Sequence, residues 1–183
     1  MTDYKSVLDA IQRDARYQNN LDWGEPRSGH PEGKIRAHIE ELERNLKRLR
    51  QKLSDLEYDK LRVLIHVHDT FKADAKAGCP ITDPRSHASL ARSFLAEFCS
   101  DPDLLAMVQY HDEPYALWRQ EHHGKLNDER FTALVNTIAD WNLFLAFLLI
   151  DGNCAGKDRG PLQWIFMKMN GRVATVFSAD DIV

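Results

Sequence analysis

Apolar residues recur along most of this chain at the spacing that places them on one face of an α-helix. From Ile35 to Leu56 they follow one another in alternating steps of four and three residues, which is a helical stripe over three heptads. Such a stripe is typical of a coiled coil or of a helix inside a bundle. Because further apolar helices follow in the sequence, we expect this one to pack against neighbours from the same chain.

Capping residues and glycines mark where the other helices begin and end. Asp83 and Asp101 each precede a proline, which is typical of a helix N-terminus, and Asn127 or Asp128 begins another apolar stretch. Helices are expected near residues 7–15, 35–56, 57–76, 84–98, 102–108, 127–148 and 162–169. Apolar and polar residues alternate only briefly, at 172–177. The sequence predicts an all-α fold, a helical bundle in a single domain spanning residues 1–183.

Composition and charge narrow the partners that we expect. The 183 residues are 43% hydrophobic and 28% charged, with a formal net charge of −4, so large nucleic acids are poor candidates. The longest apolar run, from Leu143 to Ile150, is too short to cross a membrane. The three cysteines form no CxxC pair, and we expect a cytoplasmic protein that acts on a small molecule. The oligomeric state stays open, because the leucine stripe could also pack against a second chain.

Histidines and aspartates inside or beside the expected helices are candidate metal ligands, because imidazole and carboxylate bind borderline divalent ions. The set consists of His38, His68, Asp69, His87, His111 and Asp140. Lys72 follows Asp69 by three residues and shares its helix face, where an ammonium group could neutralise an anion. Asp151 is the alternative to Asp140 as the last metal ligand of this set. The two lie about 16 Å apart along a helix, so both cannot bind the same ion.

The order of these residues resembles the HD superfamily of metal-dependent phosphohydrolases. The segments GHPEGKIRAH and HVHDTFK carry the resemblance, which extends over roughly residues 29–151. It implies a helical bundle whose metal ligands are His38, His68, Asp69 and a late aspartate, with His87 and His111 completing a second metal position. The sequence TIADW favours Asp140 as the late aspartate. Asp151 would then line the pocket or cap the following loop.

The resemblance implies hydrolysis of a small phosphoester, either a nucleotide or a phosphorylated metabolite. Water would be activated on one or two divalent ions of iron, manganese, magnesium, cobalt or zinc. Asp69 would bridge the ions or accept the proton of the water, and Lys72 would stabilise negative charge. The glycine-rich segment from Asp151 to Pro161 offers Lys157 and Arg159 to a phosphate, or else forms a solvated turn.

Two other functions stay open at this point. The same order of residues, with a lysine three positions after the aspartate, is similar to myo-inositol oxygenase, an HD-fold enzyme that uses two irons. A helical module that binds metal without catalysis is the second alternative.

The remaining histidines are expected outside the site: His66 points to the other side of its helix, whereas His30, His122 and His123 lie in turn-like, exposed sequence.

Overall fold

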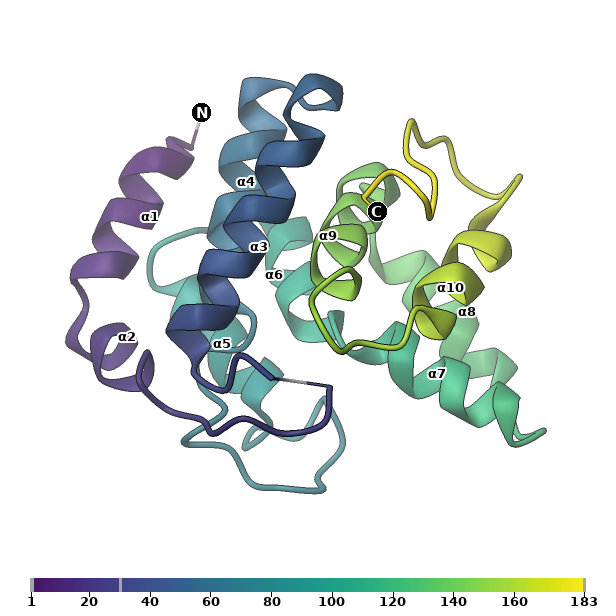
Figure 1. The fold of residues 1–183 in the computed structure, drawn as a ribbon, viewed down its shortest axis with the longest axis horizontal. Helices are drawn as coiled ribbons and strands as arrows, with labels where there is room; N and C mark the ends of the chain where they lie inside the picture. Colours follow the sequence, from purple (N-terminus) through teal and green to yellow (C-terminus); the bar gives the residue numbers. More distant parts are fainter. Residues whose placement is uncertain (1, 30, 183) are drawn as a thin grey trace.

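The chain folds into helices joined by loops, as a computed structural model that describes residues 2–29 and 31–182 shows (Figure 1). The α-helices are α1 (Tyr4–Arg13), α2 (Ala15–Asn20), α3 (Ile35–Leu49), α4 (Asp55–Val67), α5 (His87–Ala96), α6 (Pro102–Tyr110), α7 (Glu113–His122), α8 (Asp128–Thr137), α9 (Trp141–Gly152) and α10 (Gly160–Met169). A short 3-10 helix, η1 (Arg50–Lys52), follows α3. The prediction of an all-α fold is confirmed.

Helix α9 is the central element of the core. Every residue from Leu143 to Ile150 is buried, so this helix is apolar on all sides, as a helix surrounded by others must be. It packs against α3, α4 and α10, while α1 lies on α4 at the edge of the molecule (Figure 1). Burying each large apolar side chain contributes about 1.5–3 kcal/mol. The core therefore anchors α3, α4 and α9 to one another, and these helices supply part of the candidate site.

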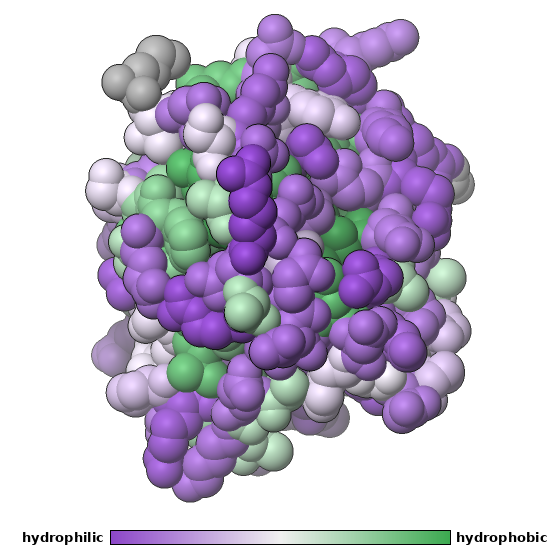
Figure 2. All heavy atoms as spheres, turned by 90° about the vertical axis from the view of Figure 1, so that its left-hand side faces the viewer, coloured by the Kyte–Doolittle hydropathy of each residue, from purple (hydrophilic) through white to green (hydrophobic). Residues whose placement is uncertain are grey.

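No single described helix is long and apolar enough to cross a membrane. Helices α8 and α9 together reach the required length and composition, but they bend by 111° at the break between them. Figure 2 shows the face that carries α1 and α2, where hydrophilic side chains surround smaller apolar areas.

The stripe predicted as one helix from Ile35 to Leu56 is divided between two helices. Helix α3 ends at Leu49, and Ser54 begins α4 through a reciprocal capping pair with Glu57. Leu53 still reaches the core from the connection, whereas Leu56 is 41% exposed. The apolar spacing thus continues through the connection between α3 and α4. The capping residues Ser54 and Glu57 are the sequence signal that a new helix begins there.

Other helix boundaries also differ from the prediction. Helix α4 ends at Val67 rather than near residue 76, and α5 begins after Ser86, whose hydroxyl accepts the N–H of Ser89, and not at Asp83. The expected continuous helix over 127–148 is broken at 138–140. There the backbone N–H groups of Ala139 and Asp140 donate to the carboxylate of Asp103, a partner that replaces helical carbonyls. Residues 172–177 form no strand.

Candidate metal centre

Two groups of histidine and aspartate side chains meet in the interior of the bundle. The first group consists of His38, His68 and Asp151, and the second group of Asp69, His87 and His111. Within each group the potential donor atoms all lie within 4.8 Å of one another. The structure therefore brings together five of the six residues proposed as ligands, with Asp151 in place of the sixth.

Ends of helices supply most of these side chains. His38 lies within α3, but His68 and His111 are the C-cap residues of α4 and α6, and His87 is the first residue of α5. Asp151 lies in the last turn of α9. Packing of the apolar faces thus determines where the donors meet, because each helix end is positioned by the core beneath it.

Asp69 joins the two groups through its two carboxylate oxygens. Oδ2 lies 3.5 Å from Nε2 of His68 and 3.9 Å from Nε2 of His38. Oδ1 faces the other way, 3.4 Å from Nε2 of His111 and 3.6 Å from Nε2 of His87. Asp69 is 5% exposed, so few water molecules compete for these oxygens. One oxygen toward each group is the arrangement that a carboxylate bridging two cations requires.

Backbone carbonyls and a carboxylate hold three of the imidazoles by Nδ1. The Nδ1 of His68 lies 3.1 Å from the Ile65 carbonyl, and that of His111 lies 2.8 Å from the Val108 carbonyl. The Nδ1 of His38 lies 3.1 Å from Oε1 of Glu32. A proton on Nδ1 leaves Nε2 bare, and each of these Nε2 atoms faces the carboxylates of the two groups. The partners of Nδ1 thus favour the tautomer that binds a metal, which His38 reaches once its Nε2 loses the proton that Asp151 stabilises.

The donors fit one or two divalent cations. The Nε2 atom of His68 is buried and makes no hydrogen bond to any described residue, although it lies 4.0 Å from Oδ1 of Asp151 and 3.5 Å from Asp69. A buried acceptor without a donor is costly unless a cation completes its environment. Imidazole nitrogens mixed with carboxylate oxygens suit zinc, iron, manganese and cobalt, so the donors alone do not select one metal.

Two lysines bring positive charge to the carboxylates. The Nζ atom of Lys157 lies 2.6 Å from Oδ1 of Asp151, and Lys72 forms a short ion pair with Asp69. Burial alone would raise the pKa of Asp69, but Lys72 and the neighbouring imidazoles outweigh it and hold the pKa well below its usual value. Lys157 and His38 do the same for Asp151. Both carboxylates are therefore ionised.

The two imidazoles of the first group differ in their protonation. Burial lowers the pKa of His68 to about 3, so this ring is neutral near pH 7. Burial acts in the same direction on His38, but Asp151, Cys154 and Glu32 outweigh it and raise its pKa to about 11. A proton on His38 and a metal ion bound by the first group would therefore compete for the negative charge of Asp151.

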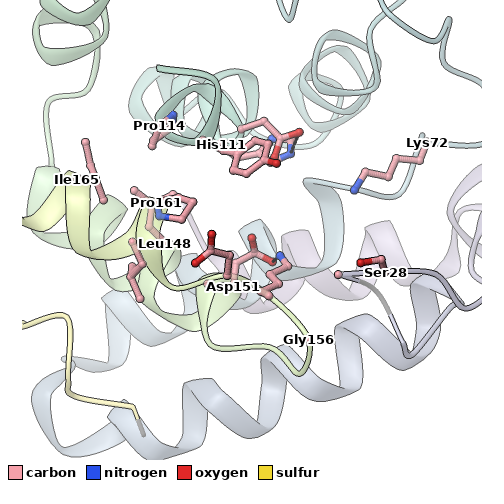
Figure 3. Close-up of a pocket in the computed structure, with 16 residues that line it drawn as sticks. Ser28, Lys72, His111, Pro114, Leu148, Asp151, Gly156, Pro161 and Ile165 are labelled. Carbon is pink, nitrogen blue, oxygen red and sulfur yellow. Dashed lines mark hydrogen bonds and ion pairs between the residues drawn. The ribbon is translucent and has the colours of Figure 1, made fainter. Parts of the chain in front are cut away.

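A cavity of about 500 Å³ opens onto the two groups (Figure 3). His111 and Asp151 lie in its middle, Lys72 and Ser28 on one side, and Pro114, Leu148, Pro161 and Ile165 on the other (Figure 3). Lys157 also lines this cavity. A small molecule in it would contact both the candidate ligands and the two lysines.

Asp140 is not part of the site, and the structure corrects that prediction. Its side chain accepts the N–H of Leu143 as the N-cap of α9, at the far end of the helix from Asp151. Asp151, the competing candidate, lies 3.1 Å from Nε2 of His38. The expectation that Arg159 faces a substrate is also wrong, because its guanidinium donates to the Ala179 carbonyl and the side chain does not line the cavity.

Two acidic residues near the groups were absent from the predicted set. Oδ2 of Asp112 lies 3.2 Å from Nε2 of His87 and 3.6 Å from Nε2 of His111. The sequence feature that could have indicated Asp112 is the second His-Asp pair, His111 and Asp112, which repeats the arrangement of residues 68 and 69. Glu32 lies in a loop six residues before His38, where only its charge could have drawn attention.

The remaining histidines lie where they were expected, as far as the structure describes them. Nδ1 of His66 is 2.6 Å from the Tyr17 hydroxyl and Nε2 is 3.2 Å from Glu43, so His66 is packed on the opposite side of α4. His122 and His123 are exposed. His30 is outside the described residues.

Comparisons with known proteins add no relative to this picture: no protein-family model matches the sequence, and neither a curated protein nor a solved structure matches it.

Proposed function

We propose that this protein is a metal-dependent phosphohydrolase of the HD superfamily, acting on a small phosphate ester. The observation that carries the proposal is Asp69, with one oxygen facing His38 and His68 and the other facing His87 and His111. A carboxylate shared between two sets of imidazoles supports two adjacent cations, the arrangement used for hydrolytic displacement at phosphorus. The resemblance in sequence order supports the same assignment.

The cations would be held by His38, His68, Asp69 and Asp151 on one side, and by Asp69, His87 and His111 on the other. Divalent ions bound there would acidify a coordinated water and polarise a phosphoryl oxygen. Asp112 lies beside the second group and offers it a further carboxylate oxygen.

The charges around the cavity favour a phosphate only when cations are bound. In the metal-free centre, three ionised carboxylates, those of Asp69, Asp112 and Asp151, face the ammonium groups of Lys72 and Lys157 and the protonated His38, for a sum of zero. Two divalent ions that displace the His38 proton change this sum to +3. A phosphate dianion would therefore find no net attraction at the empty centre and be attracted to the loaded one, with the two lysines contacting its outer oxygens.

The test is elemental analysis of protein purified without a His-tag or chelator, followed by a phosphatase panel with added manganese, cobalt, magnesium, zinc or iron. We expect metal to co-purify and phosphate to be released. His68→Ala removes a buried candidate ligand and should abolish both, whereas the exposed His122→Ala serves as the matched control and should retain both. Oxygen consumption by iron-loaded protein without phosphate release, or equal loss in the two variants, would overturn the proposal.

A further inference from the structure

The cavity above the two groups has two chemically different ends. On one side of His111 and Asp151 lie Lys72 and Ser28, and on the other lie apolar side chains from α7, α9 and α10 (Figure 3). The apolar wall consists of Pro114, Leu148, Pro161, Leu162 and Ile165. A molecule whose reacting group lies at the centre would therefore extend along the apolar wall in one direction and face the ammonium group of Lys72 in the other.

None of the five side chains of this apolar wall carries a hydrogen-bonding group. Two of the polar side chains that line the cavity are otherwise engaged, since Asp158 accepts the N–H of Gly160 and Lys157 donates to Asp151. Ser28 lies on the side opposite the apolar wall, and Tyr115, which carries a hydroxyl, also lines the cavity. A sugar or a nucleobase on the apolar wall would leave several of its polar groups unpaired. Each group buried in that way lowers affinity by about tenfold.

We propose that the substrate is a phosphate monoester whose alcohol half is a compact apolar group. This inference rests on the phosphohydrolase function proposed above and specifies the substrate of the same site. In the reaction, the oxygen of water bonds to phosphorus while the ester P–O bond breaks. Inorganic phosphate and the free alcohol result, and the proton lost by water matches the one gained by the alcohol, so no oxidant or reductant is needed. The volume of about 500 Å³ leaves room for a ring beside the phosphate.

Substitution of Tyr115 can test whether the cavity binds an apolar group. Its side chain lines the same cavity from α7 but remains 49% exposed, so replacing it leaves the buried core intact. The Tyr115 ring centroid lies 5.9 Å from that of Trp118, which holds the ring at the rim of the cavity. A ring in this position would cover one face of an apolar alcohol group.

The experiment compares benzyl phosphate with glycerol 1-phosphate on the metal-loaded protein. Both esters release an aliphatic alcohol, so a difference in kcat/KM reports the alcohol pocket rather than the leaving group. We expect at least a tenfold preference for benzyl phosphate. Tyr115→Ala should reduce this preference about fivefold, while Tyr115→Phe, which keeps the ring, should preserve it. Met167→Ala, on an exposed position of α10 away from the cavity, is the control and should leave the ratio unchanged.

A second measurement separates failure of this inference from failure of the proposed function. Calorimetry would compare the binding of benzylphosphonate and 2,3-dihydroxypropylphosphonate, neither of which is an ester. Tighter binding of benzylphosphonate that depends on the ring at position 115 would support the apolar pocket even if no phosphate ester were hydrolysed. Equal binding of the two phosphonates, or equal kcat/KM for the two esters, would overturn the inference while hydrolysis itself could still be observed.

Discussion

Replacing Asp151 by asparagine tests which aspartate of α9 completes the centre. Asparagine keeps the shape of the side chain and one oxygen acceptor but removes the charge that faces His38 at 3.1 Å and Lys157 at 2.6 Å. Asp140→Asn is the matched control on the same helix. Asparagine caps a helix about as well as aspartate, so this control should cost almost nothing.

The expected magnitudes follow from the surroundings of Asp151. Mutation of residues that only support metal ligands weakens metal binding by about 10–100-fold, so loss of a direct carboxylate should weaken it by at least about 100-fold, or about 2.7 kcal/mol. In metal-free protein, a buried cation left without its partner costs about 3–5 kcal/mol. The Lys157 side chain is 19% exposed and asparagine still accepts a hydrogen bond, so we expect about 2 kcal/mol.

Metal affinity would be measured by calorimetric titration of chelator-treated protein, and stability by denaturant unfolding of the metal-free form. A loss of about 2 kcal/mol corresponds to a lowering of Tm by about 4–8 °C in a chain of this size. Full metal affinity in Asp151→Asn would refute the assignment. So would a loss of metal in Asp140→Asn as large as that in Asp151→Asn.

Three further substitutions test one contact at the centre and two elsewhere in the fold. Glu32→Gln removes the charge that orients Nδ1 of His38 and should weaken metal binding by about 10–100-fold in the same titration; unchanged affinity would count against an orienting role. Tyr17→Phe removes the buried 2.6 Å hydrogen bond to His66 and should cost about 1–2 kcal/mol in denaturant unfolding, with metal content unchanged, since His66 lies outside both groups. Burial favours protonation of Asp101, but hydrogen bonds from Lys60 and Tyr4 outweigh it and lower its pKa from 3.8 to about 2. The contribution of the Asp101 carboxylate to the free energy of unfolding is therefore complete above about pH 4 and is lost as the pH falls toward 2. The stability difference between wild type and Asp101→Asn should therefore shrink over that interval, and a constant difference would contradict this account.

Local signals in the sequence were sufficient for the fold class and for most of the candidate site. The stripe beginning at Ile35 and the capping aspartate at 101 correspond to real helices, because they depend on neighbours within one or two turns. His38, His68 and Asp69 were identifiable from residue type and order alone. Their convergence is a property of the packed helices, and only the structure shows it.

What the sequence could not supply depends on partners distant along the chain. The break between α8 and α9 is stabilised by Asp103, more than thirty residues away, and without that break Asp140 resembles an inward-facing helical residue. Spacing showed that Asp140 and Asp151 exclude each other, but not which end of α9 faces the histidines. Arg159 was misjudged for the same reason, since its partner is the Ala179 carbonyl of the C-terminal segment.

The helix ends at the centre have an electrostatic consequence that substitutions of side chains would not remove. His68, His111 and Asp151 place the C-terminal ends of α4, α6 and α9 at the centre, while His38, His87 and Asp112 bring the N-terminal ends of α3, α5 and α7 to it. Each C-terminal end carries about half a negative elementary charge from its aligned peptide dipoles, and each N-terminal end about half a positive one. The peptide dipoles thus largely offset one another, so attraction of a cation has to come from the ionised carboxylates, and attraction of an anionic molecule from bound metal and from the ammonium groups at 72 and 157.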